Sequence, residues 1–384
     1  MSDIKSTFII LKTLLFFVFL VSGYFLSKTK SQSQYWRLSL IPIISFAIIS
    51  GFRFGRDVDY NGYYFKYINI NNSDETEILY IYLVKILRYF DIPYYIFIFI
   101  CSTFLIISFL FLLCRFRQSM IFILPLFLGF SSIENLTRWY LAFSFILIGL
   151  NFLLDKRYFI TLIFVLVACF FHKGIFICIF IIALFYFLNH KLIINNIIGV
   201  LLLFLSNFFG STKQLVFIAS FLNIFSGIGD SKTNSYIDNS QIIANGEMVS
   251  GVYMTGPLTL IIIFISYVFP IYYSDLYFKN NFNKVKNIKW IFNLGIFTLI
   301  INPIFSLVDV FNRITESLMI LSLIPIGIIT SYFYIHKKKY FLINILLLMC
   351  YCSSIFLILR HPFNLKNDSK MMFIWDAKGR NYLP

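Results

Sequence analysis

Six basic side chains and three carboxylates form the part of this sequence that could carry out chemistry. The basic residues are Arg53, Arg56, Arg138, His172, Lys173 and Arg313. The carboxylates are Asp57, Asp59 and Glu77. Arginine binds phosphate through paired hydrogen bonds and can stabilise the negative charge that develops on a leaving diphosphate. A histidine or a carboxylate can take a proton from an attacking hydroxyl, so these residue types indicate a site for a phosphate-bearing substrate.

The elements that must position these residues are apolar helices. Of the 384 residues, 59% are hydrophobic and 13% are charged, whereas a soluble domain carries about 25% charged residues. A helix of roughly 20 apolar residues crosses a bilayer. We predict one all-α transmembrane domain over 1–384 with about twelve crossings, at 8–26, 38–52, 94–114, 120–130 with its flanks, 139–154, 158–171, 174–188, 192–209, 257–273, 290–305, 314–335 and 340–359. The first crossing is expected to be a retained helix, since polar and basic residues follow it.

Basic loops orient these helices. Cytoplasmic loops are enriched in Lys and Arg, and such residues recur in every second loop here, at 28–37, 115–117, 156–157, 191, 279–289 and 337–339. Both termini are then expected outside, although the basic tail 360–384 argues against this for the C-terminus. Two long outer segments follow, at 53–93 and 211–256. The apolar stretch 78–90 carries two cations and is predicted to be an amphipathic helix in the membrane interface.

The six basic residues of the candidate site all fall at outer ends of predicted crossings. Ionisable groups at membrane depth are costly and usually mark a functional site. Each has a simpler explanation, since Arg138 could pair with Glu134 and Arg313 with Asp309 or Glu316. Any of them could also extend to the interface. Their convergence on one face favours a site for an anionic, lipid-anchored substrate such as a polyprenyl pyrophosphate.

No cofactor is expected from the sequence. The Asp, Glu and His residues show no metal-ligand spacing, and the six cysteines show neither metal-binding nor redox spacing. The sequence contains no phosphate-binding glycine loop, so a bound nucleotide is not expected. The cytoplasmic loops account for most of the net charge of +15, so nucleic acid is not an expected partner.

Five stretches occur in a characteristic order: GFRFGRDVDY at 51–60 followed by Tyr63, EILY at 77–80, NLTRWYLA at 135–142, FHK at 171–173 and FNRI at 311–314. Together they resemble the EpsG-like branch of the Wzy-type polysaccharide repeat-unit polymerases. The family elements that they resemble are, in order, G-[FL]-R-[YF]…D-Y-x-x-Y, E-P-L-Y, R-Q-x-[IL]-A, F-H-[KS] and a downstream arginine element. The chain departs from these patterns in three places. Trp139 replaces the usual glutamine, proline is missing after Glu77, and Asp57 stands where glycine is common, so Asp59 is the match to the family's acid.

The resemblance implies a GT-C-like helix bundle and a glycosyltransferase in the bacterial inner membrane, with its active site facing the periplasm. It would move a growing O-antigen or exopolysaccharide from undecaprenyl pyrophosphate to the next lipid-linked repeat unit. Arg53, Arg138 and Arg313 would hold the diphosphates, and Arg56 and Lys173 would also contact substrate. His172, Asp59 or Glu77 would act as the base or orient the acceptor. A chain-length regulator and a flippase are the expected protein partners.

Three other classes remain open, and an O-acetyltransferase has the least support among them. A lipid-linked oligosaccharide flippase should show two related halves and charges deep within its crossings, whereas here the unusual charges lie at one face and the halves look unlike. An O-antigen ligase is related in chemistry, and the segment 211–256 would suit it. The element at 53–63 favours the polymerase.

Overall fold

The computed structural model describes residues 2–54, 58–70, 77–130, 137–188, 196–209, 272–274, 276–277, 289–305, 309–364 and 372–373. Within these ranges the chain is all-α, with short 3₁₀ turns and one isolated antiparallel β-bridge between Arg53 and Phe373. The helical class predicted from the sequence is therefore confirmed for the described part of the chain.

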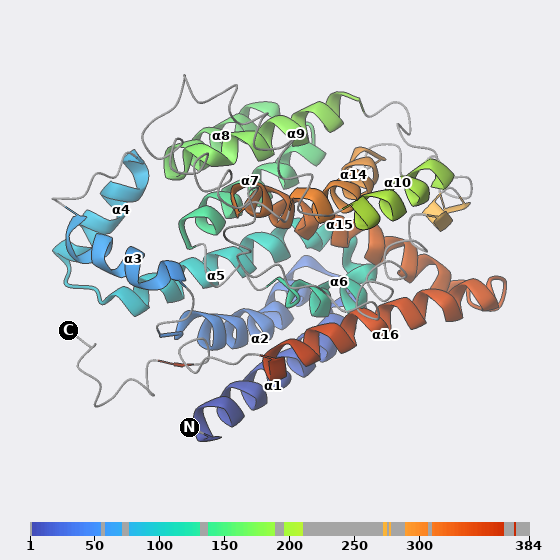
Figure 1. The fold of residues 1–384 in the computed structure, drawn as a ribbon, viewed down its shortest axis with the longest axis horizontal. Helices are drawn as coiled ribbons and strands as arrows, with labels where there is room; N and C mark the ends of the chain where they lie inside the picture. The colour runs from blue at the N-terminus through green and yellow to red at the C-terminus, as the bar shows by residue number, and fades with distance from the viewer. Residues whose placement is uncertain are drawn as a thin grey trace.

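Figure 1 shows how the described helices are arranged. Their bounds are α1 Ser2–Ser27, α2 Gln32–Gly51, α3 Val58–Ile68, α4 Ile78–Tyr89, α5 Tyr94–Leu113, α6 Met120–Phe127, α7 Thr137–Leu154, α8 Tyr158–Phe171, α9 Phe176–Phe187, α10 Asn196–Phe209, α14 Lys289–Phe305, α15 Asp309–Ile335 and α16 Phe341–Asn364. The 3₁₀ turns η2 (Cys114–Ser119) and η4 (Lys173–Ile175) join α5 to α6 and α8 to α9.

Several of these helices are apolar enough to lie in a membrane. Among the described residues, five segments have the length and composition to cross a bilayer: Ile4–Ser27, Tyr94–Phe127, Thr137–Leu154, Asn312–Ile335 and Phe341–Arg360. Shorter apolar helices cover Tyr158–Phe171, Lys173–Phe187 and Lys289–Asn302. The count of about twelve crossings and the GT-C-like arrangement stay predictions. The outer segment 211–256 and nearly all of the crossing at 257–273 lie outside the described residues.

The segment Tyr94–Phe127 is broken in the middle, where the sequence predicts a cytoplasmic loop. Phe116 has φ −113° and ψ 34° within η2, so α5 and α6 are separate helices. Arg115 in this turn donates to Asn151 and pairs with Asp155, which ties the turn to the end of α7. The guanidinium of Arg115 holds the pKa of the Asp155 carboxyl below its usual range. At eight residues, α6 rises only about 12 Å and cannot cross a bilayer alone.

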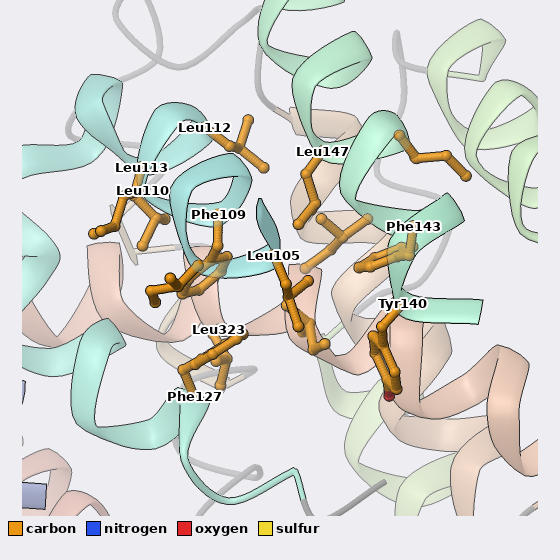
Figure 2. Packing of buried hydrophobic residues seen from close by; sticks show 14 of the residues in the cluster. Leu105, Phe109, Leu110, Leu112, Leu113, Phe127, Tyr140, Phe143, Leu147 and Leu323 are labelled. Atoms are coloured by element: carbon orange, nitrogen blue, oxygen red, sulfur yellow. The ribbon is translucent and has the colours of Figure 1, made fainter. Parts of the chain in front are cut away.

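The core draws residues from most of the described helices, and its part between α5, α6, α7 and α15 is shown in Figure 2. The rings of Phe109 on α5 and Phe127 on α6 stack with centroids 4.4 Å apart, and Leu323 of α15 packs beside them. Where α7 meets α8, a small residue brings the helices close together. A Cβ added at Gly149 would lie 3.3 Å from the Cβ of Phe164, which is the close packing typical of membrane helices.

Both ends of the described chain lie at the end of the bundle where α2 finishes. The backbone N–H of Phe54, just after α2, donates to the carbonyl of Met372 over 3.1 Å. The ring of Phe373 lies 6.2 Å from that of Phe8, near the beginning of α1. This proximity agrees with the expectation that both termini and the segment 53–93 share one side of the membrane, despite the basic charge of the tail.

We therefore predict that a topology reporter fused after Pro384 reads the same compartment as one inserted between Ile70 and Glu77. The residues 374–384 number eleven, and a crossing needs about 20. A reporter inserted at Lys338 serves as the control and should read the opposite compartment. Opposite signals from the fusion after Pro384 and the insertion before Glu77 would contradict this arrangement.

Candidate functional site

The first three residues of α7 connect the helices that carry the predicted site residues. Thr137, Arg138 and Trp139 are all buried, with exposed fractions of 5%, 9% and 3%. Because an α-helix turns about 100° per residue, three successive side chains point in three directions. Each contacts a different part of the bundle.

Thr137 contacts Arg53, which is only 2% exposed. The Arg53 Nη2 donates to the Thr137 hydroxyl over 3.0 Å. Its Nη1 donates to the carbonyl of Ser50 over 2.6 Å and to the hydroxyl of Ser102 over 3.5 Å. The Ser50 carbonyl belongs to the C-terminal end of α2, where the helix dipole favours a cation. Arg53 thus joins α2, α5 and α7, and no carboxylate in the described part of the chain pairs with it.

Arg138 contacts α4 and α3. Its Nη1 lies 3.1 Å from Oε2 of Glu77, and both side chains are 11% exposed. The guanidinium also lies over the rings of Tyr63 and Tyr80, 5.1 Å from each centroid, at distances typical of cation–π contacts. Glu77, one of the three candidate bases, therefore forms an ion pair with Arg138, which belongs to the same predicted site. The alternative partner Glu134 lies outside the described residues.

An aromatic cluster holds α3 and α4 against the start of α5. Four tyrosines recur at helical spacing on α3, namely Tyr60, Tyr63, Tyr64 and Tyr67. The rings of Tyr60 and Tyr67 each lie 5.3 Å from that of Tyr94, and the Tyr67 hydroxyl donates to the Ile92 carbonyl over 2.6 Å. Burial raises the pKa of Tyr67 to about 12, so this hydroxyl keeps its proton at neutral pH. The cluster fixes the two rings that flank Arg138.

Helix α4 has the two faces that its sequence predicts. Tyr80 and Val84 are fully buried, while Ile78, Tyr82 and Ile86 are more than half exposed. An apolar face left open at this end of the bundle (Figure 1) suits a helix that lies in the membrane interface. Glu77 is the N-cap residue of this helix, so α4 carries the carboxylate that binds Arg138.

Trp139 contacts α15 and the junction of α8 with η4. Its Nε1 donates to the Ser317 hydroxyl over 2.6 Å, and that hydroxyl donates to the Arg313 carbonyl over 2.9 Å. The indole lies 5.1 Å from the His172 ring at an interplanar angle of 75°. Trp139, which replaces the family's usual glutamine, thus joins the predicted site residues His172 and Arg313 to the start of α7.

His172 caps the turn between α8 and η4. Its backbone is extended, with φ −157° and ψ 112°, and its Nδ1 accepts the Gly174 N–H over 3.1 Å. A Cβ added at Gly174 would lie 3.1 Å from Cζ3 of Trp139 and 3.2 Å from Cε1 of His172. Only a residue without a side chain fits between these rings without displacing one of them.

The remaining predicted residues are placed less fully. Lys173 is exposed on η4, and Arg313 is partly buried on α15. Asp59 belongs to α3 directly before Tyr60, and its side chain lies outside the described part, as do Arg56 and Asp57 entirely. No group of three or more potential metal ligands occurs among the described residues.

Sequence reasoning missed Ser102, Thr137 and Ser317, which hold the site arginines and Trp139. Serine and threonine within apolar helices commonly bond to the carbonyl one turn earlier in their own helix, as Ser144 does to Tyr140. Nothing in the local sequence separates such residues from those that bond across helices. The run of three consecutive residues Thr137, Arg138 and Trp139 becomes informative only when their partners are known.

We predict that Thr137→Val lowers both thermal stability and activity. The change keeps the shape but removes the acceptor of the buried Arg53, which costs about 1–3 kcal/mol. The midpoint of thermal unfolding, followed in detergent by size-exclusion fluorescence, should fall by a few degrees. Thr103→Val is the matched control, because that hydroxyl bonds only to Phe99 of its own helix. Equal midpoints for the two variants would contradict the role of Thr137.

A known protein family matches most of this chain. The EpsG family matches residues 35–369, which contain every residue of the candidate site. No curated protein and no solved structure matches the chain. A match over most of the chain, together with apolar helices that suit a membrane, shows that this protein belongs to the EpsG family, whose class of function is polysaccharide polymerisation.

Proposed function

We propose that this protein polymerises lipid-linked oligosaccharide repeat units at the periplasmic side of the bacterial inner membrane. It transfers the growing O-antigen or exopolysaccharide from undecaprenyl pyrophosphate to a hydroxyl of the next lipid-linked unit. The observation that supports this most directly is the pair of buried arginines, Arg53 and Arg138, at the start of α7.

A diphosphate would relieve an electrostatic cost in this site. A buried cation without a counter-charge loses several kcal/mol of solvation. Arg53 has carbonyl and hydroxyl acceptors but no paired carboxylate in the described part of the chain. The N-terminal end of α7 adds a partial positive charge, to which anions bind. An anion at this helix end would compensate both the buried charge of Arg53 and the partial positive charge of the helix.

The residues can be given distinct roles in the transfer. Arg138 and Arg313 bind the diphosphates, and Arg56 and Lys173 extend this basic surface. Arg53 does not contact the diphosphate. Its buried positive charge attracts the diphosphate, and its hydrogen bond to Thr137 holds the start of α7 in place. The carboxylates Asp59 and Glu77 and the imidazole of His172 are the groups from which the proton acceptor and the orienting group for the hydroxyl come.

The interfacial helix α4 supplies a route for a lipid-anchored substrate. Its exposed residues Ile78, Tyr82 and Ile86 are apolar, whereas Glu77 at its start reaches Arg138. A polyprenyl chain can therefore remain in the lipid while its diphosphate enters the site. A chain-length regulator and a flippase are the protein partners that such a reaction requires.

Deletion of the gene in its native host tests the proposal against its rivals. A polymerase mutant should accumulate surface glycan with a single repeat unit, because assembly and export of that unit continue. A flippase or ligase mutant should show no surface glycan. Electrophoresis of the extracted glycan separates these outcomes, and the absence of a one-repeat product would overturn the proposal.

We also predict that Arg138→Ala and Arg313→Ala each lower polymer formation by about 100-fold or more, as expected for loss of one group that stabilises a developing charge. Lysine at either position should restore little, because it lacks the planar fork. Arg157→Ala is the matched control, since Arg157 is exposed and precedes α8 at the end opposite His172. Glycan gels and immunoblots read polymer and protein level. Normal polymer from either site variant would remove that arginine from the diphosphate site.

A further inference from the structure

We propose that Phe373 is a positioning residue for the transfer reaction. Its ring keeps water away from Arg53 and so keeps that arginine bonded to Thr137 at the start of α7. The inference rests on the proposed function, because Phe373 acts through Arg53. It goes further by giving a role to the C-terminal part of the chain, since Met372 and Phe373 lie beyond the residues 35–369 that the family matches.

Phe373 lies directly opposite Arg53 in an antiparallel β-bridge, which Figure 1 shows as a short red segment near the end of α2. The hydrogen bond beside this pair runs from the Phe54 N–H to the Met372 carbonyl over 3.1 Å. Because the flanking residues make this bond, Arg53 and Phe373 are themselves a non-hydrogen-bonded pair. In such pairs the Cα atoms lie about 4.5 Å apart and both side chains stand on one face. The backbone therefore places the ring beside the side chain of Arg53.

The ring of Phe373 also joins this pair to α1. Its centroid lies 6.2 Å from that of Phe8, near the beginning of that helix. Phe8, Arg53, Met372 and Phe373 are all buried, and Phe373 has no exposed surface. Arg53 bonds to groups of α2, α5 and α7. The segment that carries Phe373 thus adds α1 as a further helix at the corner where this arginine is buried.

Exclusion of water from this corner strengthens the bond between Arg53 and Thr137. The guanidinium donates to the Thr137 hydroxyl over 3.0 Å. Water would offer other acceptors to the same N–H groups, and a hydrogen bond is electrostatically stronger where the local dielectric constant is low. Because Thr137 belongs to the first turn of α7, this bond helps to hold the turn that also carries Arg138. Phe373 therefore acts on the site without contacting the substrate.

Substitutions at position 373 test this role in catalysis. In membranes supplied with lipid-linked repeat units, Phe373→Ala should lower the polymerisation rate about 10-fold, because the start of α7 loses its fixed position. Phe373→Leu should stay within about 2-fold of the wild-type rate, since leucine fills most of the same space with apolar atoms. Phe356→Ala is the matched control, because that ring is 53% exposed on α16. A wild-type rate from Phe373→Ala would overturn the proposal.

A double variant tests whether Phe373 acts through the bond between Arg53 and Thr137. Thr137→Val removes the acceptor of that bond, so Phe373→Ala should then have little further effect. The rate of the double variant should lie within about 2-fold of the slower single variant, because residues that act through one contact have non-additive effects. A ring that only stabilised the fold would act independently of Thr137. Losses that multiply in the double variant would therefore overturn the route through Arg53.

Two native cysteines can report the entry of water without any substrate. Cys101 on α5 is 6% exposed, directly precedes Ser102 and interacts electrostatically with Arg53. Cys178 is fully buried on α9 and serves as the control thiol. The probe is N-ethylmaleimide, with mass spectrometry of the labelled peptides. Labelling of Cys101 should be about 10-fold faster in Phe373→Ala than in the wild type, and labelling of Cys178 should be unchanged.

The labelling separates failure of this inference from failure of the proposed function. Unchanged labelling of Cys101 would overturn the exclusion of water by Phe373. Equal increases at Cys101 and Cys178 would show a general loss of folding and would overturn the local role. If wild-type membranes make no polymer, the proposed function fails. If they make polymer and Phe373→Ala keeps both a normal rate and normal labelling, only the role of Phe373 falls.

Discussion

The first turn of α7 is the constraint on which the rest of the site depends. Three successive residues leave the helix in different directions and join separate parts of the bundle, Thr137 to Arg53, Arg138 to Glu77, and Trp139 to Ser317 and His172. Because the three share one backbone, their partners are fixed relative to one another by the rotation of a single helix. Packing of α7 against α5 and α8 therefore sets the geometry of groups that come from distant parts of the sequence.

Placing two arginines in a largely apolar bundle requires compensation for each. Arg53 receives it from the carbonyl end of α2 and from two hydroxyls, and Arg138 receives it from one carboxylate and two tyrosine rings. The planar guanidinium suits both environments, since it can bond in several directions within its plane and stack through its faces. A lysine has neither the planar fork nor the flat faces with which the guanidinium makes these contacts. The aromatic cluster of α3, α4 and α5 is thus part of the electrostatics of the site as well as its support.

The sequence alone was enough to predict the helical membrane class and the amphipathic α4. It also drew attention to Arg53, Arg138 and His172, because charges at the outer ends of crossings stand out against an apolar background, and the structure joins these three residues to the start of α7. It could not show that Glu77 pairs with Arg138, since α4 and α7 meet only in three dimensions. The break at Phe116, by contrast, lies within the loop 115–117 that the basic residues predicted. The hydrogen bond from the Gly174 N–H to Nδ1 of His172 depends on a backbone turn, which composition and spacing do not encode.

The most direct test of this account is a structure of the protein with undecaprenyl pyrophosphate bound. The account predicts that the diphosphate lies at the start of α7, with phosphate oxygens about 3 Å from the guanidinium of Arg138. A diphosphate bound at the other end of the bundle, beside Arg115 and Arg117, with the start of α7 unchanged, would contradict it.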